Sequence, residues 1–577
     1  FDWWWVSYRM GIDSYTTENS NRIGEGAAVK ALWQNGMLSE NSLRYQYLST
    51  NLISNMNKQF GDFNVNLMLG TSTDYTKSTT NYRWGWGFEI PGFYSFGNIK
   101  DANKKFAQAH SRKRLLGVFG EVRADWKNTV FLTVTGRNDW SSTLPVENRS
   151  YFYPSVSGAI AFTELIQDRP EWLSFGKIRA SWARVGKDAS PYATSTYLNS
   201  VATMLGDMTG YGTSWTRGNP ILKPETTEST EVGLEMRFFN NRLHFDYAFY
   251  TNNTYDQIIS PRGPQSTGYI FCSQNMGDVY NKGMELTIGG TPVKTRDFSW
   301  ESSINVYGNR GTVKHLPDGT KYLYVTDVQV GNVQAASYND GPFMALSGGE
   351  WLRNENGDLV LDKNFMPQGA QSNSTQILVG NREPKFQGGW NNTLTYKGFT
   401  FNMLWEFRVG GAVFNGTEYA MTMSGMSKLT EGRDRLEITG VQASGDGYTP
   451  VETHVFEADG VYNFNGTKIS GKELIKNYYT SYYYRESRNF ITDVNSLRLR
   501  TISLSYELPK NVLAKTKCIK RASVSATANN LLLFSNYHGD PEVAVSGSGI
   551  TGSSSVGIDY CGVPSTASFS FGVNLTF

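Results

Sequence analysis

The feature that most constrains the fold is a strict alternation of apolar and polar residues in long segments. The last eleven residues, ASFSFGVNLTF (Ala567–Phe577), place apolar side chains at every odd position and small or polar ones at every even position. Successive side chains of a β-strand point to opposite faces, so a period of two predicts strands with one apolar and one polar face. Further segments of this kind are GVFGEVRADW (117–126), TVFLTVTGRNDW (129–140), KIRASW (177–182), RLHFDYAF (242–249) and FNMLWEFRV (401–409).

Strand length favours a membrane β-barrel over a soluble β-sandwich, in which alternation also occurs. Several runs last about ten residues or more, as tilted membrane strands do, whereas strands of soluble sheets have about five or six. Aromatic clusters that suit an interfacial girdle occur at YFYP (Tyr151–Pro154) and NYYTSYYY (Asn477–Tyr484). The chain has 33 Tyr, 32 Phe, 15 Trp and 58 Gly, with a mean hydropathy of −0.42. No uninterrupted apolar run approaches the roughly 18 residues of a membrane helix, which excludes a helical membrane protein.

The connections between the predicted strands are of two kinds. FFNNRL (Phe238–Leu243) and TYKGFTF (Thr395–Phe401) predict tight hairpins, with Asn-Asn and Lys-Gly as turn residues. Short turns at one rim and long loops at the other are typical of outer-membrane barrels, and the pattern predicts about sixteen strands. In Asn495–Leu508 the apolar phase changes from odd to even positions, which predicts a β-bulge near Thr501. Four long, irregular loops are expected at Thr76–His110, Lys187–Pro224, Gly311–Pro384 and Gly410–Asn489.

Motifs for chemistry are scarce. The three cysteines are too few and too scattered for a disulfide framework, and the five histidines show no metal-ligand spacing. HExxH, CxxC and GxSxG are absent from the sequence. The 54 Lys and Arg nearly balance the 52 Asp and Glu, so the whole-chain charge does not indicate a nucleic-acid partner. The sequence therefore predicts no catalytic residues and a protein that is not an enzyme.

Several longer stretches resemble the SusC/RagA-type TonB-dependent outer-membrane transporters, and they occur in that family's order. NNLLLFSNYHGDPEV (Asn529–Val543) is similar to the family's last-loop segment. The other matching stretches are GRNDWSSTLP (Gly136–Pro145), YFYPSVSGAIAF (Tyr151–Phe162), KIRASWARVGKDASPY (Lys177–Tyr192), NPILKPETTESTEVGLEMRFFNNRL (Asn219–Leu243), NMGDVYNKGMELTI (Asn275–Ile288), REPKFQGGWNNTLTYKGF (Arg382–Phe399) and SLRLRTISLSYELPKNVL (Ser496–Leu513).

The resemblance implies an all-β, transmembrane antiparallel barrel of 22 strands with long extracellular loops and short periplasmic turns, in the outer membrane of a Gram-negative bacterium. Residues 1–577 would form its C-terminal part. An N-terminal plug, a TonB-contacting segment and the first strands are expected in the assembly. Phe577 resembles the terminal aromatic by which the barrel-insertion machinery recognises its clients. The resemblance also implies a SusD-like lipoprotein lid, energy from the TonB complex and contact with outer-membrane lipid, and it allows a dimer of transporter–lid pairs.

Four aromatic side chains are the candidates for substrate binding. Trp84 and Trp86, in NYRWGWGFEIPGFYSFGN, and Tyr211 and Trp215, in GYGTSWTRGN, stand among Gly and polar residues in the expected loops. An aromatic face can stack on the apolar face of a sugar ring while neighbouring polar groups bind its hydroxyls. The alternative is that these rings pack the loops together or contact the lid.

One segment has the spacing of a calcium loop. In RNENGDLVLDKN (Arg353–Asn364), the residues Asn354, Asn356, Asp358 and Asp362 fall at positions 1, 3, 5 and 9 of an EF-hand-like loop. Leu359 replaces the glycine at position 6, and Phe365 replaces the acid at position 12. We therefore expect a turn without metal and no cofactor, with a calcium site as the alternative.

The leading functional hypothesis is active import of an oligomeric nutrient. Within the family that the chain resembles, glycans are the commonest cargo and peptides are the main alternative. A passive, porin-like or structural barrel is the hypothesis from another class, and the presence of a plug and a TonB-contacting segment distinguishes the two. The sequence does not identify the cargo.

Overall fold

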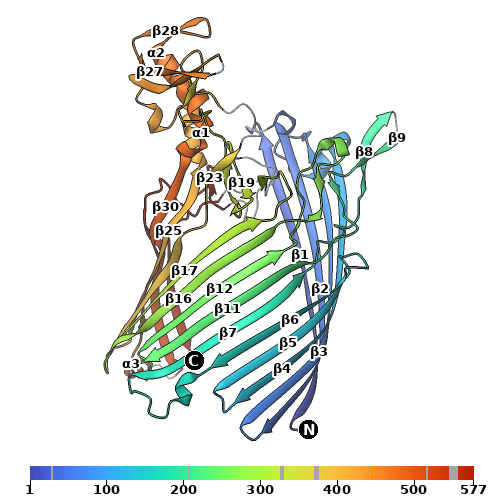
Figure 1. The fold of residues 1–577 in the computed structure, drawn as a ribbon, viewed down its shortest axis with the longest axis vertical. Helices are drawn as coiled ribbons and strands as arrows, with labels where there is room; N and C mark the ends of the chain where they lie inside the picture. The colour runs from blue at the N-terminus through green and yellow to red at the C-terminus, as the bar shows by residue number, and fades with distance from the viewer. Residues whose placement is uncertain are drawn as a thin grey trace. The chain divides into compact units, whose positions relative to one another are not determined.

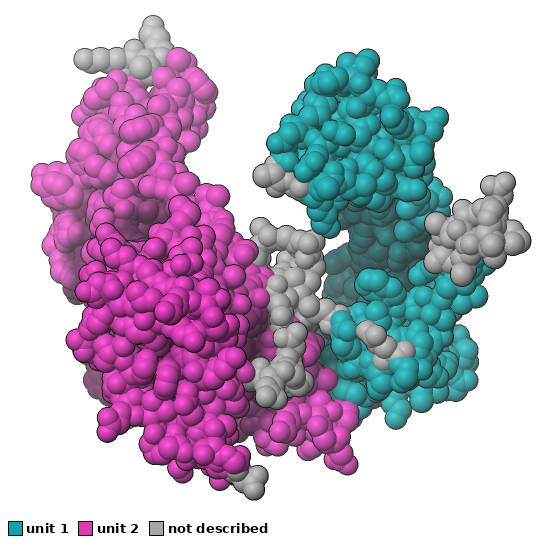
Figure 2. Space-filling model, turned by 90° about the horizontal axis from the view of Figure 1, so that it is seen from above, with its two compact units in different colours: residues 1–161, 179–230, 254–276 teal, residues 162–178, 231–253, 277–577 magenta. Residues whose placement is uncertain are grey.

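The computed structural model describes residues 1–27, 30–205, 208–324, 330–369, 376–445, 447–514, 518–544 and 556–577. The chain forms two compact units: unit 1 comprises residues 1–161, 179–230 and 254–276, and unit 2 comprises residues 162–178, 231–253 and 277–577 (Figure 2). Most described residues lie in antiparallel strands. No helix in the described part of the chain is long and apolar enough to span a membrane.

Unit 1 is built on an up-and-down meander of long strands, drawn in blue to cyan in Figure 1. Its register places Ile12 opposite Leu48, Leu48 opposite Tyr75, and Tyr75 opposite Arg114. The meander consists of β1 (Trp4–Glu25), β2 (Asn35–Phe60), β3 (Phe63–Trp86), β4 (Lys105–Trp126), β5 (Val130–Ser141) and β6 (Ser150–Ile160).

Unit 2 contains a second antiparallel meander. It consists of β16 (Asp278–Lys294), β17 (Phe298–Lys314), β24 (Phe386–Tyr396), β25 (Phe399–Asn415), β30 (Ile491–Glu507), β31 (Arg521–Ser535) and β33 (Ser568–Thr576). The residues of β7 (Leu173–Lys187), β11 (Glu225–Phe238) and β12 (Leu243–Tyr255) are divided between the two units. With these three, the meander strands that the structure describes number sixteen, as the sequence predicts.

The apolar face of the last strand is open to the surroundings. On β33, Phe569, Phe571 and Leu575 are 67%, 85% and 47% exposed. A soluble sandwich would bury these side chains between two sheets. Their exposure is the arrangement that a lipid-facing strand requires.

The predicted turns and the predicted bulge are confirmed. Lys397 and Gly398 form a two-residue hairpin between β24 and β25, with φ of 44° and 90°. Phe239, Asn240 and Asn241 all have positive φ in the turn that follows β11. The pairing of β30 with β25 and with β31 shifts between Leu499 and Thr501, so Arg500 is the bulged residue.

The first expected loop is shorter than predicted. Within Thr76–His110, β3 continues to Trp86 and β4 begins at Lys105, so only residues 87–104 connect them. The strands here carry polar side chains on both faces, which removes the alternation on which the sequence prediction depends. Cross-strand hydrogen bonds hold the extension, including one from Gln108 Nε2 to Asn81 Oδ1 (2.7 Å).

Where the structure describes them, the expected irregular loops Gly311–Pro384 and Gly410–Asn489 are instead largely folded. Residues 325–329, 370–375 and 446 lie outside the described residues. The described parts of the two loops form α1 (Gly416–Ser424), α2 (Gly471–Asn477) and several small sheets. Their strands are β18 (Tyr322–Tyr324), β19 (Val333–Tyr338), β21 (Ala345–Gly348), β22 (Val360–Leu361), β23 (Ile377–Gly380), β26 (Arg435–Ser444), β27 (Gly447–Glu457), β28 (Val461–Phe464) and β29 (Thr467–Ser470). Figure 1 shows α1, α2, β27 and β28 above the ends of β25 and β30.

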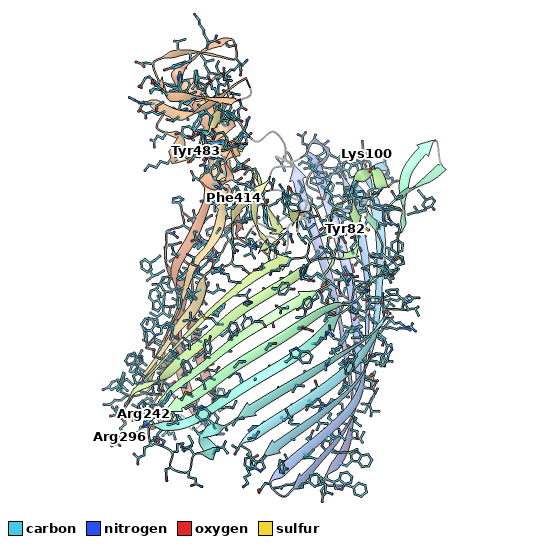
Figure 3. The ribbon with its side chains drawn as sticks, viewed as in Figure 1. Tyr82, Lys100, Arg242, Arg296, Phe414 and Tyr483 are labelled. Carbon is cyan, nitrogen blue, oxygen red and sulfur yellow. The ribbon has the colours of Figure 1, made fainter. Side chains whose placement is uncertain are left out.

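These segments have hydrophobic cores of their own. One core contains Leu361, Met366, Phe456, Leu474 and Ile475, among others. A second core joins Phe414 to Phe490, and Tyr483 packs against it (Figure 3). We call residues 351–369 and 428–485 the loop module.

The cluster NYYTSYYY belongs to the loop module, and its expected place in an interfacial girdle is wrong. Tyr478–Tyr482 forms a π-helical turn, and Tyr478 is buried in the core. The sequence pattern misleads here because aromatic clusters serve equally well in a small hydrophobic core. In YFYP, Phe152 is exposed on the apolar face, whereas Tyr153 contacts Asp139 on the other face of the sheet.

Candidate functional site

The two faces of the unit 1 sheet differ in chemistry, and we name them the apolar face and the polar face. The apolar face carries exposed Leu116, Val118 and Val122 of β4 and, by pairing, Leu69 and Leu67 of β3. The polar face carries the alternate residues. Such a division is typical of barrels whose outer surface contacts lipid and whose inner surface contacts water.

The polar face of β2 and β3 is nearly uncharged. Between Ser39 and Asn57 on β2, and between Asn64 and Tyr82 on β3, Asp74 is its sole charged side chain. The phenol of Tyr47 donates a hydrogen bond to Asp74 Oδ1 (2.5 Å), and the rings of Tyr15 and Tyr45 stack with centroids 4.9 Å apart. The remaining polar groups on these two strands are Ser39, Asn41, Tyr45, Ser49, Asn51, Asn55, Asn57, Asn64, Asn66, Ser72, Thr76, Ser78, Thr80 and Tyr82.

An arginine network occupies the polar face of β3–β6. Arg137 Nε donates to Asp139 Oδ1 (2.7 Å), and its Nη2 donates to Ser72 Oγ (2.8 Å). Tyr153 donates to the other oxygen of Asp139. Gly117 provides the space, because a Cβ there would lie 2.1 Å from Arg137 Nη2. The GRNDW motif therefore fixes four neighbouring strands to one another.

Three of the family-like motifs meet at that end of the unit 1 strands from which the long connections start. Asp188 accepts hydrogen bonds from Lys113 Nζ (2.6 Å), Thr143 Oγ1 (3.2 Å) and the Ser141 hydroxyl. A small core of Leu144, Ala189 and Leu222 lies beside them. The motifs GRNDWSSTLP, GKDASPY and NPILKP thus build the rim of unit 1.

The structure places two of the predicted aromatic residues differently from expectation. Trp84 and Trp86 lie in β3 and not in a loop, on the same face as Tyr82, whose position Figure 3 marks. Their ring centroids are 5.1 Å apart, and both side chains are half-buried. Asn103 Nδ2 donates to the carbonyl of Trp86 (3.0 Å), which fixes this end of the strand.

The other two predicted aromatics lie in the segment between β7 and β11. Tyr211 belongs to β9 (Met208–Thr213), which pairs with β8 (Leu198–Leu205), and Trp215 precedes β10 (Thr216–Arg217). Their side chains are 69% and 71% exposed. In the described part of the chain, no ring contact joins either of them to Trp84 or Trp86.

Trp215 lines a hollow of about 470 Å³ in unit 1 together with Tyr192 and Tyr197. The two tyrosine rings meet edge to face with centroids 6.4 Å apart. Sequence reasoning missed both tyrosines, although they stand in a Ser-, Thr- and Ala-rich segment much like those around the chosen residues. Polar groups complete the lining: Ser190, Ser195, Asn199, Ser214, Thr216 and Ser273.

The backbone around this hollow is firmly held. The carbonyl of Trp215 accepts hydrogen bonds from the amides of Ile270 and Phe271, both 2.9 Å long. Tyr192 has a φ of 67°, a conformation that non-glycine residues rarely adopt, and its hydroxyl accepts a bond from Arg112 N (3.2 Å). Exposed rings on a fixed backbone form a preorganised surface, because little motion remains to be lost on binding.

The residues of the candidate calcium loop divide between two separate turns. Asn354 Oδ1 accepts from the amides of Asn356 (3.0 Å) and Asp358 (2.8 Å), and its Nδ2 donates to Asp358 Oδ2 (3.0 Å). Asp362 Oδ1 accepts from the amides of Asn364 and Met366 at 2.7 and 2.9 Å. Among the described residues, no three His, Cys, Asp or Glu side chains are grouped to hold a metal. These oxygens therefore cap turns.

In unit 2, a buried ion pair fixes the segment after β31 to the polar face of β30. Arg498 contacts Asp540, and both side chains are only 5% exposed. Asp540 also accepts from the amides of Glu542 and Ser565, both at 3.1 Å. Burial opposes ionisation of Asp540, but the hydrogen bonds from Glu542, Ser565 and Arg498 hold its pKa below its ordinary value. The bulged Arg500 binds Glu406 (2.8 Å) and Glu542 (2.7 Å) beside this pair.

The last residue, Phe577, follows β33 and is 68% exposed. Its proposed part in barrel insertion stays a prediction.

Comparison with known proteins agrees with this architecture. A family model described as "TonB dependent receptor-like, beta-barrel" matches residues 1–415. TonB-dependent receptor P3 of Formosa agariphila is 26% identical, over 98% of this chain and 56% of that protein. TonB-dependent receptor SusC of Bacteroides thetaiotaomicron is 25% identical, over 92% of this chain and 50% of that protein.

A solved structure titled "Structure of the RagAB peptide transporter" has the same fold, with a TM-score of 0.76 and 19% identity over 100% of this chain and 60% of that one. The chain spans about half the length of the curated relatives it matches. Together with the two-faced strands and the motif-built rim, the family model shows that the chain belongs to the TonB-dependent receptors, a family of outer-membrane proteins, and that residues 1–415 match their β-barrel.

Proposed function

We propose that the chain acts in the TonB-driven import of an oligosaccharide, together with an N-terminal plug and a SusD-like lipoprotein lid. The observation that carries the choice of cargo is the polar face of β2 and β3, on which Asp74 is the sole charged side chain. Asn, Ser, Thr and Tyr side chains there offer many donors and acceptors with little net charge. A neutral, hydroxyl-rich solute can exchange its water for such groups without leaving a buried charge unpaired.

The hollow beside Trp215 supports the same cargo. Exposed rings of Trp215, Tyr192 and Tyr197 surround hydroxyl and amide groups, which is the combination that binds a sugar ring by stacking and hydrogen bonding. A volume of about 470 Å³ lies within the usual range for small-molecule sites, roughly 300–1,000 Å³.

A peptide is the second candidate cargo. Asparagine side chains carry the same donor and acceptor as a peptide group, so the Asn-rich polar face of β2 can pair with an extended backbone. The fold shared with the RagAB peptide transporter is compatible with this cargo as well.

Uptake by cells that carry the whole transporter tests the proposal. Labelled neutral oligosaccharides and uncharged peptides of similar mass are offered to wild-type and deletion strains, with and without a protonophore. We expect transporter-dependent uptake of oligosaccharide that stops when the proton gradient collapses. Uptake of peptides alone would replace the proposed cargo, and uptake that persists without the gradient would indicate a passive pore.

A further inference from the structure

The apolar face of β2–β4 ends abruptly, and cationic side chains lie directly beyond its edge. On β3 the apolar-face residues are Phe63, Val65, Leu67 and Leu69, then Thr71, Thr73 and Tyr75, and the next residue on that face is Lys77. On β4 the corresponding series runs from Trp126 to Leu116 and then reaches Arg114 and Arg112. Arg44 of β2 is placed likewise, two rows beyond Leu48.

These cations are neighbours on adjacent strands. Lys77 is paired directly with Arg112, and Tyr75 with Arg114. Like charges directly opposite each other on an antiparallel pair are destabilising. No carboxylate oxygen in the described part of the chain lies within 4.0 Å of Lys77, Arg112 or Arg114. Farther along the same face, by contrast, Arg83 has its partner in Glu40 (2.5 Å).

A hollow of about 710 Å³ opens at this boundary, all of it within unit 1. Leu116 and Trp140 contribute apolar surface to it, and Arg114 and Arg149 contribute positive charge. Asp74 also lines the hollow, but it belongs to the polar face of β3, where its carboxylate accepts a hydrogen bond from Tyr47. The guanidinium of Arg114 lies 5.4 Å from the ring centroid of Tyr75, which orients it. The hollow thus combines apolar surface with the positive charge of two arginines.

We propose that this boundary binds the phosphate group of a phosphorylated lipid in the outer leaflet. The guanidinium groups of Arg112 and Arg114 can each form paired hydrogen bonds with phosphate oxygens. The amine of Lys77 adds a positive charge. The lipid chains then lie along exposed Leu116, Val118 and Val122. An anion here relieves the repulsion between Lys77 and Arg112, which no carboxylate among the described residues does.

The test measures lipid bound to the whole transporter, purified in detergent and exchanged into nanodiscs that contain a bis-phosphorylated lipid A or its dephosphorylated form. The variant is Lys77→Gln/Arg112→Gln/Arg114→Gln. The control, Lys58→Gln/Lys127→Gln, removes two cations at the opposite, short-turn end of the β2–β4 sheet, Lys58 from β2 and Lys127 from the turn after β4. Bound lipid is counted by native mass spectrometry, and circular dichroism confirms that each variant keeps its strands.

We expect the phosphorylated lipid to bind wild-type and control protein equally well. Each removed cation lowers the affinity about fivefold, so the triple variant loses roughly a hundredfold. Equal retention by the triple variant overturns the proposal. Equal binding of the dephosphorylated lipid also overturns it, because the acyl chains alone would then account for binding. Displacement of the lipid by millimolar inorganic phosphate would reassign the site to the free ion.

Discussion

Removal of the Asp540 carboxylate should release the segment that follows β31. In Asp540→Ala, Arg498 stays buried, with a side chain only 5% exposed, and loses its buried partner. It keeps only Glu542, which is 40% exposed and lies 3.4 Å from Arg498 Nε. Breaking a buried ion pair from one side costs about 3–5 kcal/mol. The substitution also removes the acceptors of the Glu542 and Ser565 amides.

Amide hydrogen exchange measures this loss of local stability directly. Since about 1.4 kcal/mol corresponds to a factor of ten, the amides of Glu542 and Ser565 should exchange roughly a hundred to a few thousand times faster in the variant. The whole transporter in detergent is labelled, digested and analysed by mass spectrometry. Amides in the middle of β31 serve as the internal reference and should not change.

Two further variants test whether the buried Arg498–Asp540 pair holds this segment. Arg498→Leu/Asp540→Leu removes both charges of the pair, so no buried charge is left unpaired. The Glu542 and Ser565 amides should therefore exchange more slowly in this double variant than in Asp540→Ala. Arg435→Ala removes two ion pairs, with Glu437 and Glu457, in which all three side chains are about half exposed, and exposed pairs contribute under about 1 kcal/mol each. Unchanged exchange at Glu542 and Ser565 in Asp540→Ala would show that the buried pair does not hold this segment.

Three other predictions concern separate parts of the chain. Trp215→Ala should weaken oligosaccharide binding about tenfold, measured by calorimetry on the whole transporter. The control Trp172→Ala should leave the affinity unchanged, and equal affinities of Trp215→Ala and wild type would rule out stacking at Trp215. Burial lowers the pKa of His454, which stacks on Phe365 at 4.0 Å. Because the folded loop module then prefers the neutral ring, its resistance to protease should be full above pH 6.5 and decrease as the pH falls below that value, and His454→Phe should abolish the pH dependence. Gly398→Ala places a Cβ at a φ of 90° and should destabilise the folded protein by about 1 kcal/mol or more in urea titrations; an unchanged midpoint would contradict this.

The sequence predicts the membrane-facing part of the fold well because lipid imposes a simple rule there. Each strand must be apolar on alternate residues, so the phase change near Thr501 is enough to predict the bulge at Arg500. Turn residues such as Lys397 and Gly398 are equally readable, since few residues tolerate positive φ.

Beyond the membrane the same rule no longer applies. The strand extension that ends at Trp86 has water on both faces, so no alternation marks it. Tyr478 belongs to a core that α2 and β27 form together with β22. Because β22 is far from α2 and β27 in the sequence, no local pattern predicts this core. The hollow at Trp215 likewise depends on Tyr192 and on the support of Ile270, which only the tertiary structure brings together.

The length of β1–β4 has a mechanical consequence for capture. β2 has 26 residues, whereas about 9–11 suffice to cross a bilayer. The stretch from Asn35 to Tyr47 therefore continues past the lipid boundary for roughly 40 Å measured along the strand, at about 3.4 Å per residue, and a tilt of about 40° makes this roughly 30 Å along the membrane normal. A collar made of hydrogen-bonded sheet keeps its form in the absence of cargo, so an arriving molecule meets a stiff frame that holds the connecting segments far out from the cell surface.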